Sequence, residues 1–246
     1  MITELFLKGR LRHAMRAEEQ EAVEDAIDHT IHLGGREKLV ERGERVDYSY
    51  YLVEGSMMRF IDDRRGFRQI VGLQVPGDWV DLHSFPMKRL DHDVQELAPA
   101  KLAVYKHDCL QELIEKHPRL ARIMWFSTLL DAAMHREWIF RLGRLNAEGR
   151  IAHTICELIE RVRMVGLYDE GKFPFPLTQQ DFGEICGITT VHSNRTMRLL
   201  RERELLRYDE GARTLTILDE SGLKSVGEFD AAYLYGAGEL HLTNPY

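Results

Sequence analysis

The chain has 246 residues, of which 44% are hydrophobic and 30% are charged, a balance typical of folded globular proteins. This length is enough for two domains with cores of their own. A formal net charge of −7 argues against a protein coated in nucleic acid but leaves room for a local basic face. The three cysteines lie far apart, which favours buried thiols in a reducing compartment over a disulfide framework.

No apolar run approaches the roughly 20 residues that are needed to cross a bilayer. The N-terminal segment MITELFLKGRLRHAM is interrupted by charge too often for a secretory signal peptide. We therefore expect a cytoplasmic protein with no membrane partner.

The N-terminal part, residues 1–117, predicts a helical segment followed by a small sheet. Residues 3–32 carry an apolar stripe at helical spacing. From residue 36 to about residue 105, short apolar runs alternate with glycines, and we expect strands in SYYLVEGSMMRFI, GFRQIVGLQVPGDWV and AKLAVYKHD, with a turn at residues 62–66. Short strands at regular spacing indicate a small antiparallel barrel or jelly roll.

A long helix is expected from Cys109 to Leu145, interrupted early by Pro118. Apolar side chains recur along it at steps of three and four residues and form a narrow seam, with Asp131 and Arg141 nearby. The seam consists of Leu120, Ile123, Ser127, Leu130, Met134 and Trp138. It fits a dimerisation helix over residues 118–145 that pairs with its twin, and it also fits an ordinary helix packed on its own sheet.

Residues 177–206 predict two short helices joined by a tight turn. Thr178 can cap the first helix, and Asp181 closes a capping-box-like start. Gly183 lets a neighbouring helix approach closely, and Gly187 stands where the chain must reverse. The buried face of this helix is expected to contain Phe182, Ile185 and Ile188.

The second helix of this pair begins at a cap formed by Thr189 or Thr190. Its expected buried stripe consists of Val191, Met197 and Leu200. The other face carries His192, Asn194, Arg195, Arg198 and Arg201. A helix-turn-helix places such a face in the DNA major groove, although an arginine-rich helix face is more often simply solvated.

The segment from Leu205 to Leu218 raises the odds of DNA binding, because it predicts two strands around an Asp-Glu-Gly-Ala turn. A helix-turn-helix followed by a hairpin is a winged helix, and this order of elements is more specific than any one of them. We place this domain at residues 146–220, with Asn146 capping its first helix. Residues 221–246 are expected to be a C-terminal tail.

The run LTQQDFGEICGITTVHSNRTMRLLRE resembles the signature of the Crp/Fnr family of bacterial transcription regulators. The resemblance covers roughly residues 20–220 and includes marks at residues 43–44, 50–55 and 76–78. It implies an α+β fold with an N-terminal antiparallel β-roll related to cyclic-nucleotide-binding domains, a dimerisation helix and a C-terminal winged helix-turn-helix. It also implies a homodimer on a palindromic operator in double-stranded DNA, and contact with RNA polymerase.

The resemblance also assigns roles to residues of the second helix. The family's base-reading positions fall on Thr190, Val191, Asn194 and Arg195, and Arg195 matches a guanine-reading arginine. Val191 departs from well-known members, which have a glutamate there, so the preferred half-site should differ from theirs. The residues expected to meet the DNA backbone are Thr178, Gln179, Thr189, His192, Arg198 and Arg201.

In the sensor half, the sequence departs from the cyclic-nucleotide-binding members of the family. Their Gly-Glu pair is replaced here by Asp81 and Leu82, and their Arg-Ser or Arg-Thr pair falls nearest to Leu90 and Asp91, with Arg89 close by. A carboxylate aimed at a phosphate site repels the ligand. We therefore expect no cyclic AMP binding and no cofactor, and the effector stays unknown.

Other sensor chemistries receive less support. An iron–sulfur centre needs an N-terminal cysteine cluster, and no cysteine precedes Cys109. Haem sensing has candidate ligands in His83 and His92, although a satisfied histidine is the more common case. His29 and His32 have a metal-like spacing for a helix but lack a third ligand, so we assign no metal site.

Two other functions compete with DNA binding. A ligand-sensing regulatory module that acts through a protein partner is the alternative, and it requires the arginine-rich face to be solvated surface. A metal-dependent enzyme of the β-barrel type needs a His-x-His pair, which is absent from this sequence, as are a phosphate-binding glycine-rich loop and a nucleophile elbow. We therefore expect no enzyme.

Overall fold

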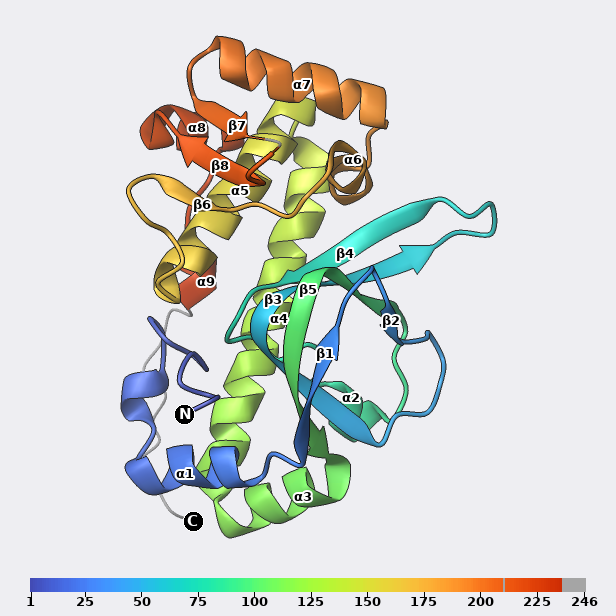
Figure 1. The fold of residues 1–246 in the computed structure, drawn as a ribbon, viewed down its shortest axis with the longest axis vertical. Coiled ribbons are helices and arrows are strands. Elements are labelled where there is room, and N and C mark those ends of the chain that lie inside the picture. The colour runs from blue at the N-terminus through green and yellow to red at the C-terminus, as the bar shows by residue number, and fades with distance from the viewer. Residues whose placement is uncertain (210, 236–246) are drawn as a thin grey trace. The chain divides into compact units, whose positions relative to one another are not determined.

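The computed structural model describes residues 1–209 and 211–235 and contains two compact units. Unit 1 consists of residues 1–59 and 73–133 together with residue 235, and unit 2 consists of residues 60–72 and 134–234. The elements of both units are shown in Figure 1. No helix in the described residues is long and apolar enough to cross a membrane.

The N-terminal segment is less helical than the sequence predicts. It contains a short 3-10 helix at Arg12–Ala14 and helix α1 at Ala17–Asp25, after which the chain enters strand β1 at His29–Leu33. The prediction of helix up to residue 32 is therefore wrong at its end. Strand β1 pairs antiparallel with strand β5 (Asp93–Lys106), and this long-range pairing overrides the local helical pattern.

The predicted strands form one antiparallel sheet. Strand β3 spans Tyr48–Asp62, β4 spans Arg68–Gln74, and the sheet order is β1-β5-β3-β4, with the short strand β2 (Lys38–Val40) also on β5. The turn between β3 and β4 lies where the sequence predicts it, and the Asp63 N–H donates to the carbonyl of Phe67 at 2.9 Å. This sheet and the short helix α2 (Ser84–Met87) form the N-terminal roll.

Aromatic side chains form the centre of the unit 1 core. Phe6, Tyr51 and Trp79 meet edge to face, and Trp79 also lies against Tyr105 with ring centroids 4.7 Å apart. The predicted long helix is divided in two, α3 at His107–Lys116 and α4 at Pro118–Arg144. Pro118 opens α4 because its fixed φ and missing N–H suit the first position of a helix.

The apolar seam predicted on α4 turns inward. Leu120 and Ile123 are 0% exposed and belong, with Leu130, to the core of unit 1. In unit 2, Trp138 is buried and donates its indole N–H to Glu157. These residues therefore pack within the chain and do not form the dimer seam that the sequence analysis assigns to them, whereas the half-buried Ser127 and Met134 lie at its margin.

The opposite face of α4 is apolar as well, and it is exposed. Its exposed apolar residues are Trp125, Leu129, Ile139 and Phe140, with exposures of 64%, 49%, 71% and 41%. We call these four residues the outer stripe. Trp125 and Leu129 lie one helical turn apart, and large exposed apolar side chains that gather on one face mark interaction sites.

Unit 2 contains the predicted winged helix-turn-helix. Helix α5 (Ala147–Met164) begins at Asn146, whose side chain accepts the Gly149 N–H at 2.9 Å, as predicted. Helices α6 (Gln179–Cys186) and α7 (Thr190–Glu202) follow, and then the hairpin of β7 (Leu206–Asp209) and β8 (Thr214–Ile217). A third strand, β6 at Lys172–Pro174, pairs with β8 where the sequence predicts a loop, because Phe173 is buried there.

The domain continues beyond residue 220, where the sequence analysis places a tail. Helix α8 (Glu220–Gly227) packs along α5, and α9 (Ala232–Tyr235) follows it. Leu223 and Leu234 are buried, and the carbonyl of Gly227 contacts the His153 ring at 3.0 Å. Residues 221–235 are therefore part of the folded chain, and the rest of the predicted tail lies outside the described residues.

Candidate DNA-binding site and effector pocket

The first helix of the helix-turn-helix begins at the predicted capping box. The Thr178 N–H donates to the Asp181 carboxylate at 2.7 Å, and the Asp181 N–H donates back to the Thr178 hydroxyl at 3.2 Å. Phe182 and Ile185 are fully buried beneath it, whereas Ile188 is half-buried. The sequence prediction for this helix is thus confirmed at its start and on its buried face.

Two glycines set the turn between the helices. Gly187 has a φ of 62°, the left-handed conformation that favours glycine at a helix end. At Gly183, a Cβ atom would lie 2.7 Å from the carbonyl oxygen of Ile188, which is too close for any side chain. Both glycines therefore have the roles that the sequence predicts, and they fix how closely α6 and the start of α7 pack.

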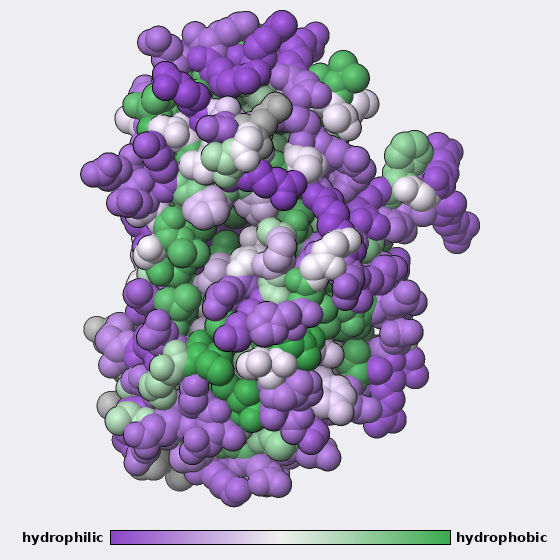
Figure 2. All heavy atoms as spheres, viewed as in Figure 1, coloured by the Kyte–Doolittle hydropathy of each residue, from purple (hydrophilic) through white to green (hydrophobic). Residues whose placement is uncertain are grey.

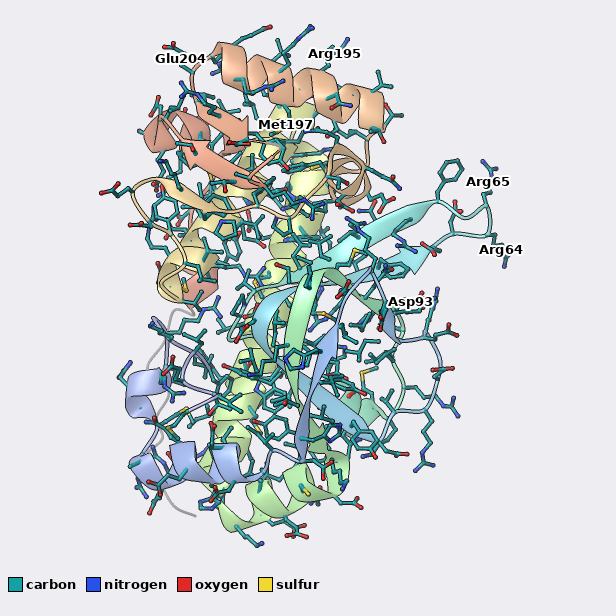
Figure 3. The ribbon with its side chains drawn as sticks, viewed as in Figure 1. Arg64, Arg65, Asp93, Arg195, Met197 and Glu204 are labelled. Carbon is teal, nitrogen blue, oxygen red and sulfur yellow. The ribbon has the colours of Figure 1, made fainter. Side chains whose placement is uncertain are left out.

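Helix α7 is capped by Thr189, whose hydroxyl accepts the His192 N–H at 3.2 Å. Its buried side is formed by Ser193, Thr196, Met197 and Leu200. Val191 is 80% exposed, so its predicted place in the buried stripe is wrong. In Figure 3, Arg195 points away from the domain, and Figure 2 shows hydrophilic residues over this end of unit 2.

The four predicted base-reading residues, Thr190, Val191, Asn194 and Arg195, are all exposed. They come from the first two turns of α7, where steps of three and four residues place side chains on one face. Within the described part of the chain, the Arg195 guanidinium forms no hydrogen bond or ion pair. It is therefore available to pair with a guanine.

The predicted backbone contacts fall into two groups. Thr178 and Thr189 use their hydroxyls as helix caps, and Gln179 accepts a hydrogen bond from the Ser193 hydroxyl at 3.1 Å, which ties α6 to α7. Arg198 and Arg201 are exposed, and Arg198 lies 3.5 Å from Glu202 in a surface pair that costs little to break. The half-buried His192 follows the Thr189 cap.

The sequence analysis missed the residues that anchor the helix-turn-helix. Arg150 on α5 donates to the carbonyl of Cys186, the last residue of α6, at 3.0 Å. A cation at this position compensates the negative end of the helix. Arg203, just after α7, pairs with Glu148 on α5. Neither pair can be inferred from a local pattern, because each joins residues more than 30 positions apart.

In the N-terminal roll, the residues expected at a nucleotide pocket have partners within the chain. Asp81 is fully buried, and its carboxylate accepts the Tyr50 N–H at 2.7 Å and the Ser84 hydroxyl at 3.1 Å. It therefore does not face a phosphate site, and the charge repulsion that we expected from it is the wrong reason for excluding the ligand. Leu82 is buried in the core.

The residues expected at the second nucleotide-binding pair, Arg89 and Asp91, also have partners within the chain. Arg89 donates to the carbonyl of Gly43 at 2.5 Å, and Asp91 contacts the His92 ring nitrogen Nδ1 at 2.8 Å. His83 and His92 lie with ring centroids 5.2 Å apart. Burial lowers the pKa of His83 to about 3, with a further contribution from the charge of Arg59. Among the described residues, no three metal-ligating side chains cluster closely enough to hold a metal ion.

The burial of Asp81 predicts a pH dependence. Burial raises its pKa from 3.8 to about 7, so between these values the folded state binds more protons than the unfolded state. The contribution of the Asp81 carboxyl to folding stability is fully present below about pH 4 and is lost as the pH rises through about 7. As the pH rises from 5 to 8, the free energy of unfolding of Asp81→Asn, measured in urea, should therefore increase by roughly 2 kcal/mol relative to that of the unmodified chain.

The matched control for this prediction is Asp91→Asn, because Asp91 is exposed and its pKa is lowered rather than raised. Its effect on unfolding should stay nearly constant between pH 5 and pH 8. Equal pH profiles for the Asp81→Asn variant and the unmodified chain would contradict the raised pKa of Asp81.

Comparisons with known proteins agree with this arrangement. A family model described as a Crp-like helix-turn-helix domain matches residues 149–226. The transcriptional activator protein FnrL of Cereibacter sphaeroides is 26% identical over 184 residues, which are 72% of this chain and 71% of that protein. The anaerobic regulatory protein of Haemophilus influenzae is 22% identical over 209 residues, which are 85% of this chain and 80% of that protein.

The fold has a counterpart among known structures. The structure of FixK2 from Bradyrhizobium japonicum matches with a TM-score of 0.73 and 22% sequence identity, and the match covers 80% of this chain and 96% of that chain. The arrangement of a β-roll, a long helix and a winged helix-turn-helix is thus a known one.

Proposed function

Because this chain is a DNA-binding transcription regulator of the Crp/Fnr type, we propose that it binds a palindromic operator as a homodimer and needs neither cyclic AMP nor an iron–sulfur cluster to do so. The exposed α7 face, with Arg195 unengaged, is the observation that carries the proposal. The alternative, a module that acts only through a protein partner, leaves this face without a role. We place the protein in the cytoplasm, with RNA polymerase as its partner at promoters.

The outer stripe of α4 supports the homodimer. A symmetric dimer uses the same patch on both copies, so an apolar patch on one helix can be self-complementary. Trp125 and Leu129 form such an exposed patch in unit 1, and Ile139 and Phe140 form another in unit 2. The dimer thus still forms through the helix that the sequence predicts, but through its other face.

The recognition face suggests what a half-site contains. Arg195 can pair bidentately with guanine, and Asn194 can pair with adenine. Val191 offers only methyl groups, which suit the methyl of a thymine. Two such faces in a symmetric dimer read an inverted repeat with half-sites about one helical turn apart.

The engaged residues of the roll support independence from cyclic AMP. Asp81, Arg89 and Asp91 already bind groups of the chain, and Leu82 fills the core, so a nucleotide would have to displace these contacts. We expect saturating cyclic AMP to leave both the melting temperature and the operator affinity unchanged. A ligand specific for the folded state must raise the melting temperature, so a clear rise would contradict this part of the proposal.

The dimer is tested by the purified protein on two duplexes, one with two half-sites and one with a single half-site. The proposal predicts ligand-free binding to the paired half-sites that is at least a hundredfold tighter than binding to the single one. Equal affinity for both duplexes would contradict a dimeric reader.

A further inference from the structure

An ion pair in unit 1 joins a buried arginine of the sheet to a partly exposed aspartate of α4. Arg59, on β3, is 2% exposed, and its Nη1 atom lies 2.6 Å from the carboxylate of Asp131 on α4. The same guanidinium donates to the carbonyls of Val80 at 2.8 Å and Trp79 at 3.4 Å. The arginine is therefore held on the sheet side by fixed backbone acceptors, and Asp131 is held against it.

Two histidines lie near Arg59. His83 and His92 lie close enough for the charge of Arg59 to lower the pKa of both rings, after the larger effect of burial. Both rings therefore favour the neutral form more strongly than a free histidine does. A buried charge of this kind depends on its partner, because an unpaired guanidinium in the core is strongly unfavourable.

The pair lies on the side of α4 that faces away from Trp125 and Leu129. At about 100° per residue, Leu129 and Asp131 point about 160° apart around the helix axis, whereas Trp125 and Leu129 differ by only about 40°. Drawing Asp131 toward Arg59 therefore turns Trp125 and Leu129 outward. Rotation of α4 that broke the pair would carry these side chains toward the sheet.

We propose that the Arg59–Asp131 ion pair sets the rotation of α4 about its axis. It thereby positions Trp125 and Leu129 of the outer stripe for dimer formation. Arg59 and Asp131 are positioning residues for the operator-binding dimer, and this role rests on the proposed homodimer through α4. Because the chain supplies both charges itself, the stripe is presented without a ligand. The pair thus accounts for a dimer that forms in the isolated protein.

Disulfide crosslinking between two copies measures the rotation directly. A cysteine is introduced at Leu129, in the outer stripe, or at Thr128, which lies about 100° away around the helix, in a Cys109→Ser background. The other native cysteines, Cys156 and Cys186, are buried. With the ion pair intact, we expect crosslinking at position 129 to exceed that at position 128 at least fivefold.

Asp131→Asn should reduce this ratio toward one and raise the dimer dissociation constant about tenfold, with unchanged helix content by circular dichroism. Asp131→Glu, which keeps the charge, should largely restore both values. The matched control is Asp62→Asn, because Asp62 pairs with Arg68 at 3.0 Å on the surface. An unchanged crosslinking ratio in Asp131→Asn would overturn the proposal.

A double variant keeps the test decisive if Asp131→Asn unfolds. Arg59→Met with Asp131→Leu removes both charges and leaves no unpaired charge in the core, a replacement that folded proteins tolerate. The crosslinking ratio must fall in this variant also, and a ratio equal to that of the unmodified pair would overturn the proposal. Absence of crosslinks at both positions with the pair intact would instead show that the homodimer through α4 is wrong.

Discussion

Replacing Arg195 by alanine is expected to weaken binding to the operator by between roughly 30-fold and 10⁴-fold. One bidentate arginine–guanine pair contributes about 1–3 kcal/mol of discrimination, and a dimer makes two such pairs. The side chain is exposed and forms no pair in the described part of the chain, so its removal leaves the folded state unchanged. Titration of the purified variant on operator and on unrelated duplex gives both affinities.

The comparison with Arg198→Ala separates base reading from charge. Arg198 is predicted to meet a phosphate, so its loss should weaken binding to both duplexes alike and reduce the salt dependence. Arg195→Ala should instead weaken operator binding far more than unrelated binding. Unchanged operator affinity in Arg195→Ala would contradict its assignment as a base reader.

Leu129→Glu is expected to abolish the dimer and, with it, high affinity for the paired half-sites. The substitution places a carboxylate in the apolar outer stripe, and symmetry brings two of them into one interface, where an unpaired buried charge is costly. We expect the dimer dissociation constant to rise at least a hundredfold, measured by sedimentation, with the melting temperature of the monomer little changed because Leu129 is 49% exposed.

Two further variants show whether the outer stripe is the relevant face. Leu218→Glu changes an apolar side chain of similar exposure, 47%, outside α4 and should leave the dimer intact. Leu130→Ala truncates a buried residue on the inner face of α4. It should therefore lower the free energy of unfolding by about 2–5 kcal/mol, unlike a change in the outer stripe. A dimer that persists in Leu129→Glu would contradict assembly through the outer stripe.

The helix-turn-helix could be predicted from the sequence because its determinants are local. Thr178 and Asp181 form a cap within one helical turn, and Gly183 and Gly187 set a turn over a few residues. These features depend on neighbours in the chain, so a pattern reveals them. The position of Val191 in the sequence fits both the buried stripe and the base-reading face, and only the structure shows that it is exposed.

The face of α4 could not be predicted, because the helix is apolar on two sides. The seam through Leu120 and Ile123 and the stripe through Trp125 and Leu129 both have helical spacing. Periodicity identifies amphipathic faces, but the core against which each packs is set by residues far away in the sequence. The ion pair between Arg59 and Asp131, which are 72 positions apart, is a contact of that kind.

The N-terminal roll shows the same limit for side-chain direction. The sequence predicts that Asp81 faces a nucleotide pocket, whereas in the structure its carboxylate turns inward to Tyr50 and Ser84. The strand β1 and the helix α8 depend on β5 and α5, respectively, and their own short sequences carry weak patterns. Long-range packing therefore decides these elements.

The central claim, a dimer that reads DNA without a ligand, is tested most directly by selection from a random duplex library with the purified protein alone. The account predicts enrichment of an inverted repeat with half-sites about one helical turn apart, and loss of that enrichment in Arg195→Ala. Failure to enrich any sequence at low salt, from a protein that is folded and dimeric, would contradict it.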